Sequence, residues 1–166
     1  PMTALGIDFG TTNTVLASVS PEGIAHAHGF HHSGAMQDAV RTALSFRRDT
    51  TRGNPPVPDV GPWAIQDFID SPEETRFLQS FKSFAASPSF SDTAVFTRRY
   101  AFEDLMGIFL RRIMARGGLT ALPERLVIGR PVTFAGQNPD DALAHRRYVA
   151  ALQSLGFSDT HFVLEP

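Results

Sequence analysis

The first third of the chain alternates apolar and polar positions in the manner of β-strands. Leu5, Ile7 and Phe9 share one face of a predicted strand, with Gly6 and Asp8 on the other. Turn residues separate this strand from three more runs of strand character. The four predicted strands lie at 5–9, 14–20, 24–30 and 42–48. The first two are close enough in sequence to form an antiparallel hairpin.

The middle of the chain switches to proline-rich and then to helical patterns. Residues 49–62 contain four prolines and two glycines, which predicts a surface loop, and 63–70 is predicted as a short helix. Ser71-Pro72-Glu73-Glu74 has the order of a helix start, with a capping serine, a proline in the first turn and a glutamate that can complete a capping box. This signature predicts a second helix that runs toward Gln79 and ends near Lys82.

The last third combines two amphipathic helices with two short strands. Apolar residues recur at spacings of three and four over 102–116 and again over 139–155, where Asn138-Pro139-Asp140-Asp141 provides the cap. Strands are predicted at 126–129 and 161–164, each following a helix. This order predicts an α/β domain whose mixed sheet has an N-terminal β-hairpin meander and parallel strands flanked by helices.

Composition narrows the class of protein. The chain has 166 residues, a net charge of −2 and 42% hydrophobic residues, which is typical of one globular domain. It has no cysteine, so disulfides and thiolate metal sites are excluded. The near-neutral charge argues against a nucleic-acid partner, and the longest apolar run, 105–110, is far shorter than a membrane span. The first basic residue is Arg41, so we expect no secretory leader and a cytoplasmic setting.

Lysine and histidine are distributed unevenly. Fourteen of the 15 basic residues are arginine, and Lys82 is the only lysine. Either it is chance in an arginine-rich chain or a compact ammonium is required at that place. His26, His28, His31 and His32 fall within seven residues. They form either an exposed strand and loop or, less favoured because no carboxylate or cysteine is near, a transition-metal site.

The clearest chemical signal is the segment Asp8-Phe9-Gly10-Thr11-Thr12-Asn13 at the end of the first strand. A glycine turn with hydroxyl residues can direct backbone N–H groups and threonine side chains at phosphate oxygens. The carboxylate at the strand end can hold a hydrated Mg²⁺. The alternative is an ordinary β-hairpin in which turn amides satisfy Asp8.

Gly6-Ile7-Asp8-Phe9-Gly10-Thr11-Thr12-Asn13-Thr14 resembles the first phosphate-binding motif of the actin, hexokinase and heat-shock-70 ATPase superfamily. Three later segments favour the heat-shock-70 (DnaK-like) branch, in particular its divergent YegD-type chaperones. They are Ser80-Phe81-Lys82-Ser83-Phe84, the run from Leu126 to Phe134 that contains Arg130-Pro131, and the run from Gly156 to Glu165-Pro166. The four segments span almost the whole chain in the order that this family has.

The resemblance implies a ribonuclease-H-like fold, ATP and Mg²⁺ as ligands, and specific roles for the matched residues. Asp8 would hold Mg²⁺ through water, and Gly10, Thr11, Thr12 and Asn13 would bind the phosphates. Lys82 would place the attacking water and stabilise the transferred phosphoryl group, and Glu165 would lie near the metal. Pro131 would couple the nucleotide state to the rest of the molecule. The arginine that usually helps it is unassigned, because three basic residues compete for the position: His145, Arg146 and Arg147.

The same resemblance implies that residues 1–166 are the N-terminal lobe of a two-lobed nucleotide-binding domain. The second phosphate motif, the adenosine motif and any peptide-binding domain would follow Glu165-Pro166. We therefore expect ATP hydrolysis only in the complete protein, with ATP and ADP as ligands and client proteins or co-chaperones as partners. Two alternatives stay open: a sugar or metabolite kinase of the same superfamily, and a non-catalytic module that binds nucleotide or protein.

Overall fold

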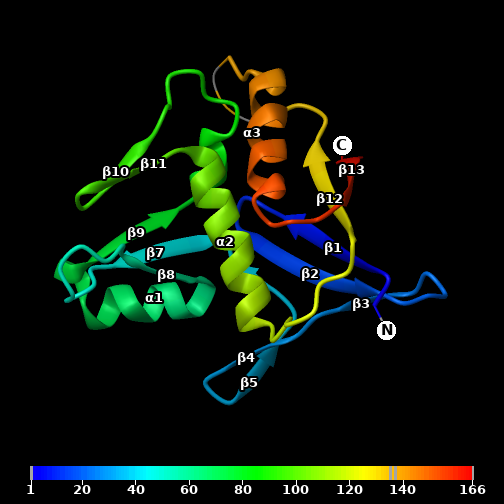
Figure 1. The fold of residues 1–166 in the computed structure, drawn as a ribbon, viewed down its shortest axis with the longest axis horizontal. Helices are drawn as coiled ribbons and strands as arrows, with labels where there is room; N and C mark the ends of the chain where they lie inside the picture. The colour runs from blue at the N-terminus through cyan, green and yellow to red at the C-terminus, as the bar shows by residue number, and fades with distance from the viewer. Residues whose placement is uncertain (1, 135, 137, 166) are drawn as a thin grey trace.

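The larger of the two main sheets has six strands, both parallel and antiparallel, and lies on the right in Figure 1. The structure is a computed structural model that describes residues 2–134, 136 and 138–165. Along the sheet the strand order is β13-β12-β1-β2-β3, with β6 also paired to β2. The strands are β1 (Ala4–Phe9), β2 (Asn13–Val19), β3 (Ala25–Ala27), β6 (Val40–Arg41), β12 (Arg125–Pro131) and β13 (Asp159–Glu165). β1 runs antiparallel to β2 and parallel to β12, and β13 is parallel to β12. The predicted mixed sheet of parallel and antiparallel strands flanked by helices is confirmed.

A second, smaller sheet lies beside the main one and carries its own helix (Figure 1). Its order is β8-β7-β9, all antiparallel. Its strands are β7 (Ala43–Arg47), β8 (Val57–Val60) and β9 (Thr75–Gln79). Two separate hairpins complete the strands: β4 (Phe30–His32) pairs with β5 (Ala35–Gln37), and β10 (Thr93–Val95) pairs with β11 (Arg98–Tyr100). Helix α1 (Gly61–Asp70) follows β8 directly, and proline in its first turn suits its start.

Helices α2 (Phe102–Arg116) and α3 (Asp141–Gln153) pack on one face of the main sheet, as predicted. The apolar stripe of α2 is fully buried, and its Phe109 ring lies 5.8 Å from the Phe9 ring of β1. Tyr148 of α3 packs on the same Phe9 ring at 6.1 Å. At the start of α3 the Asp140 carboxylate accepts a hydrogen bond from the Leu143 N–H, so the helix is capped two residues after Asn138, where the predicted capping sequence begins. Phe9 therefore joins both helices to the strand that ends in the candidate phosphate motif.

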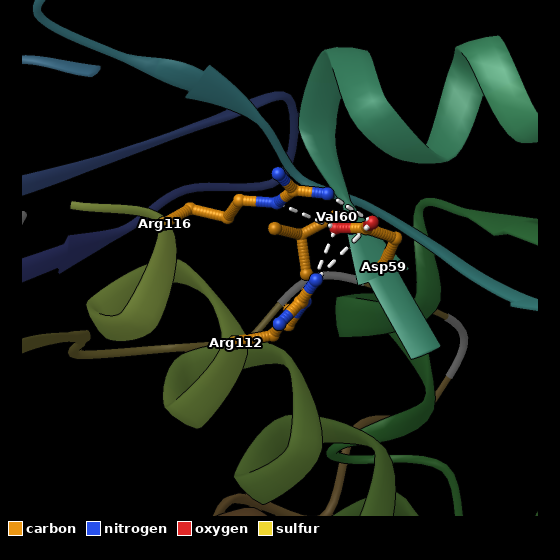
Figure 2. A network of polar contacts seen from close by, with 4 residues as sticks. All are labelled: Asp59, Val60, Arg112 and Arg116. Atoms are coloured by element: carbon orange, nitrogen blue, oxygen red, sulfur yellow. Dashed lines mark hydrogen bonds and ion pairs between the residues drawn. The ribbon is translucent and has the colours of Figure 1, made fainter. Parts of the chain in front are cut away.

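A partly buried ion-pair network attaches the smaller sheet to α2 (Figure 2). The Asp59 carboxylate on β8 accepts hydrogen bonds from Arg112 Nε at 3.3 Å and Arg116 Nε at 3.1 Å. The Arg116 guanidinium also stacks 4.5 Å from the Trp63 ring, so the only tryptophan packs against the core rather than forming an open platform. A guanidinium that is both paired and stacked fixes the orientation of the two layers.

The predicted second helix over 71–82 is wrong. Ser71 forms no side-chain cap, residues Pro72–Glu74 make one short 3₁₀ turn, and Thr75–Gln79 is strand β9. In β9 the buried Thr75 and Leu78 help to close the smaller sheet against β7. Pairing with β7 gives this segment a full ladder of backbone hydrogen bonds, and tertiary context of this kind overrides a local capping signal.

Two further expectations need correction. Residues 49–62 were predicted as a surface loop, but β8 and the buried Asp59 and Val60 lie in its second half. The strand predicted at 24–30 is divided, because β3 pairs with β2 whereas Phe30 begins β4 in a separate hairpin. In both cases the partner strand is distant or the pairing is too short to leave a periodic pattern.

Candidate functional site

The β1–β2 hairpin closes through a very tight turn at the predicted phosphate motif. The Gly10 N–H donates to the Asn13 carbonyl at 3.0 Å. A Cβ atom placed on Gly10 would lie 2.4 Å from that carbonyl oxygen, which no real side chain tolerates. Glycine is therefore required here for close approach of the two backbones.

Thr42, which the sequence analysis did not single out, braces this turn from the neighbouring chain segment. Its hydroxyl donates to the Gly10 carbonyl at 2.8 Å, and its N–H donates to the Thr12 carbonyl at 2.8 Å. Because the Thr42 hydroxyl proton is used in this way, the Thr14 hydroxyl must be the donor in the 2.8 Å bond between the two threonines. No local pattern around Thr42 indicates this role, since the contact spans 32 residues.

The tip of the turn presents unused hydrogen-bond donors. Thr11, Thr12 and Asn13 are exposed. Within the described part of the chain, neither the N–H nor the hydroxyl of Thr11 and Thr12 forms a hydrogen bond. A rigid turn with free N–H and O–H groups is suited to bind an anion.

Lys82 lies against this turn. It belongs to the 3₁₀ helix Phe81–Phe84, whose first residue is fully buried against Phe9 and Phe109. The Lys82 ammonium donates to the Phe9 carbonyl at 2.8 Å, and so lies at the base of the phosphate motif, 73 residues away in sequence. The sole lysine of the chain thus lies beside the candidate phosphate motif.

Asp8 and Glu165 lie on the open face of the main sheet, opposite the face on which α2 and α3 pack. Both line one shallow depression whose floor includes Gly6 and Gly129. The Glu165 carboxylate lies directly over Gly129, because a Cβ on that glycine would be 2.0 Å from Glu165 Oε1. The β1–β12 register pairs Ile7 with Ile128, and its continuation sets Asp8 beside Gly129. Glycine at 129 therefore leaves the space that the Glu165 carboxylate occupies, in the depression that it shares with Asp8.

Burial and the two carboxylates set the electrostatics of Lys82. Burial lowers the pKa of its ammonium from the usual 10.5, and the nearby Glu165 and Asp8 charges oppose that change. The ammonium binds the carbonyl of Phe9, the residue that follows Asp8, and Asp8 lines the same depression as Glu165. The structure brings one cation and two anions together at the end of β1.

Pro131 lines the same pocket as Lys82 and Thr11. This pocket has a volume of about 190 Å³ and is completed by Ser83, Ala86, Thr133 and Phe134. Ser83 and Thr133 were not predicted as site residues. The available signal is their position, because each is a hydroxyl residue close to Lys82 or Pro131 in a candidate motif. The pocket opens at the carboxyl ends of two parallel strands, β1 and β12, where ligand sites of open α/β sheets commonly form.

The three competing basic residues on α3 have different environments. Arg147 donates hydrogen bonds to backbone carbonyls of the segment 84–90. Arg146 is exposed, and His145 packs its ring 4.8 Å from that of Phe162, with Nδ1 buried and without a partner in the described residues. None of the three lines the pocket that holds Pro131, so the coupling arginine stays unassigned.

The histidine cluster is dispersed. His28 Nε2 hydrogen-bonds to the Gly117 carbonyl, and the His32 ring packs 5.4 Å from that of Trp63. In residues 2–134, 136 and 138–165, no three histidine, aspartate or glutamate side chains gather in a way that could hold a metal ion. Asp8 and Glu165 are only two carboxylates and so do not form a cluster of three metal-ligating side chains. Mg²⁺, however, needs only one or two carboxylates in addition to phosphate oxygens and water.

No known protein-family model matches this chain. In addition, none of the helices in the described residues is long and apolar enough to cross a membrane.

Proposed function

We propose that this chain is the phosphate-binding N-terminal lobe of an actin-like, ribonuclease-H-like ATPase of heat-shock-70 type. In this proposal it binds the phosphates of Mg-ATP and Mg-ADP and hydrolyses ATP only as part of the complete two-lobed protein. The ATPase cycle then controls a chaperone activity on client proteins.

The observation that carries this proposal is the convergence on one sheet end of three different chemistries. A hairpin with free donors at Thr11 and Thr12 and the carboxylate of Asp8, a half-buried ammonium at Lys82, and the carboxylate of Glu165 come from three separate chain segments. A β-hairpin does not need a hydrogen bond from a lysine 73 residues away to form its turn. Together these groups match the needs of a triphosphate and a divalent cation.

The carboxylates fit Mg²⁺ by the chemistry of their oxygen donors. Asp8 and Glu165 are exposed on an open face, so they can hold the ion through its water shell. When bound, Mg²⁺ neutralises phosphate charge and makes the terminal phosphoryl group easier to transfer. The free donors of Thr11 and Thr12 bind phosphate oxygens, and the tight turn at Gly10 lets the backbone approach them.

Lys82 supplies the positive charge at the reacting group. Phosphoryl transfer is mostly positioning and electrostatics, and one well-aimed donor contributes about 10²–10³ in rate. The ammonium is partly desolvated, which strengthens its attraction to an anion compared with a lysine in water. Pro131 lines the same pocket, and in this proposal it responds to whether that group is present.

The single lysine provides a direct binding test on the 166-residue chain. Biosynthetically labelled lysine gives one carbon–proton NMR signal at Cε, which belongs to Lys82. Mg-ATP at millimolar concentration should shift this signal, and Thr11→Val or Asp8→Asn should weaken the shift. Glu73→Gln, an exposed carboxylate on another element, is the matched control. A Lys82 signal that stays unchanged even when Mg-ATP is well above the about 1 mM affinity limit of the isolated chain would refute the proposed phosphate site.

Turnover must be measured in the complete protein. Lys82→Ala should lower ATP hydrolysis about 100-fold or more while the affinity for ATP changes little, because the ammonium acts mainly on the transition state. Lys82→Arg should not restore the rate, since a forked guanidinium is larger than an ammonium. Hydrolysis that requires an added sugar would instead identify a kinase, and nucleotide binding without turnover would identify a non-catalytic module.

A further inference from the structure

Arg147 holds the chain segment that follows Lys82. One of its guanidinium nitrogens, Nη1, donates to the carbonyls of Phe84 at 2.6 Å, Ala85 at 3.3 Å and Ser87 at 3.1 Å. The other, Nη2, donates to the Phe90 carbonyl at 2.6 Å. In the described residues Arg147 has no carboxylate partner, and its two terminal nitrogens donate to these four carbonyls.

The same segment is attached to α3 at a second place. The Asp140 N–H at the start of the helix donates to the Ala86 carbonyl at 2.9 Å. Within the segment, Ala85 and Ala86 are buried and the rings of Phe84 and Phe90 stack 4.0 Å apart. Residues 84–90 therefore form a closed loop whose position follows that of α3.

Lys82 lies in the short 3₁₀ helix between two anchors. Before it, the Phe81 side chain is buried against Phe9 and Phe109. After it, Arg147 binds the carbonyls of Phe84 and Ala85, the end of the turn, where the backbone carries partial negative charge and lacks internal donors. The ammonium is at the end of a long flexible side chain, so its place depends on how firmly both ends of the turn are held.

We infer that Arg147 is the positioning residue for Lys82: it ties the lysine turn to α3 and so sets the ammonium against the phosphate motif. The kinetic part of this inference rests on the proposed ATPase function, whereas the structural part does not. If Arg147 is removed, the loop loses four charge-assisted hydrogen bonds and the ammonium loses its fixed distance from the Phe9 carbonyl. A misplacement of about 1 Å at a reacting centre can cost about 100-fold in rate.

The structural part is tested on the 166-residue chain by the NMR signal of Lys82. Its ammonium lies 5.6 Å from the centre of the Phe9 ring, so the ring displaces the Cε proton signal from the position of a free lysine. Arg147→Met, which keeps the aliphatic stem, should move this signal toward the free position. Arg146→Met, the exposed neighbour on α3, should leave it unchanged. If Arg147→Met does not fold, Arg147→Gln serves instead, and a wild-type Lys82 signal in a folded Arg147 variant overturns the inference.

The kinetic part is tested in the complete protein. Arg147→Met should lower turnover about 10–100-fold with the Michaelis constant for ATP changed less than about twofold, and Arg147→Lys should recover part of the rate. If Lys82→Ala abolishes turnover but Arg147→Met does not lower it, the positioning role is wrong while the ATPase proposal survives. If the Lys82 signal moves in Arg147→Met but Lys82→Ala leaves turnover unchanged, the proposed function fails and the positioning contact stands.

Discussion

The Asp59 network allows a quantitative prediction for stability. Asp59→Asn keeps the size of the side chain and the acceptor for the Val60 N–H at 3.0 Å, but removes the charge that Arg112 and Arg116 share. These arginines are four residues apart on α2, so without the carboxylate they repel each other. The substitution therefore isolates the electrostatic term with little change in packing.

The burial of the three side chains sets the expected magnitude. The Asp59 side chain is 10% exposed, and those of Arg112 and Arg116 are 36% and 30% exposed. Exposed ion pairs contribute about 0.2–1 kcal/mol, whereas breaking a buried pair costs about 3–5 kcal/mol. This network lies between the two cases, so Asp59→Asn should lower the free energy of unfolding by about 2–3 kcal/mol. For a chain of this size that corresponds to a loss of roughly 4–12 °C in Tm.

The pH dependence gives a second test of the same reasoning. Burial tends to raise the pKa of Asp59, but the hydrogen bonds from Arg116, Arg112 and the Val60 N–H outweigh it and lower the pKa below 3.8. A carboxyl group whose pKa is lower in the folded state stabilises the fold at pH values above its unfolded-state pKa. This stabilisation is lost as the pH falls through its folded-state pKa. The stability difference between wild type and Asp59→Asn should thus be full at neutral pH and shrink below about pH 4.

Urea unfolding followed by circular dichroism at neutral and acidic pH measures this difference. Asp70→Asn, an exposed carboxylate at the end of α1, is the control and should change stability by less than about 0.5 kcal/mol. The Trp63 fluorescence, which reports on the stacked Arg116, should change in Asp59→Asn and not in the control. A loss no larger than that of Asp70→Asn would show that the network does not hold the smaller sheet to α2.

Five further outcomes are expected. Tyr148→Phe should stabilise the fold by about 1 kcal/mol in urea unfolding, because the Tyr148 hydroxyl is buried without a hydrogen-bond partner in the described residues. Burial also raises the pKa of Tyr148, so an absorbance titration should find this phenol neutral above pH 10. Gly10→Ala should destabilise the hairpin by about 1–3 kcal/mol and remove the Lys82 NMR response to Mg-ATP, since its Cβ would meet the Asn13 carbonyl. Elemental analysis of untagged protein should find less than one equivalent of zinc, nickel or copper, while His28→Ala lowers Tm by about 2–4 °C through loss of its bond to Gly117. Calorimetry on the 166-residue chain should detect no ATP site tighter than about 1 mM, or about −4 kcal/mol, and micromolar affinity would contradict the two-lobed proposal.

The sequence by itself determined the elements whose evidence is local. The periodic stripes of α2 and α3 and the alternation in β1 each lie within one element, and each has a single arrangement that buries its apolar face. The glycine turn at the end of β1 and the isolated lysine were visible for the same reason. The order of strands and helices was then enough to predict the mixed sheet and its parallel strands.

Only the tertiary structure decided which segments pair and which side chains meet. The segment 75–79 follows a helix-capping signature yet is a strand, because β7 offers it a ladder of hydrogen bonds and a buried face for Leu78. The contacts of Thr42 with Gly10 and of Arg147 with the lysine turn span 32 and more than 50 residues. Both donate to backbone carbonyls, which every residue possesses, so no pattern of residue types marks them. Contacts of this kind depend on how the elements pack, and that arrangement is determined by the core as a whole.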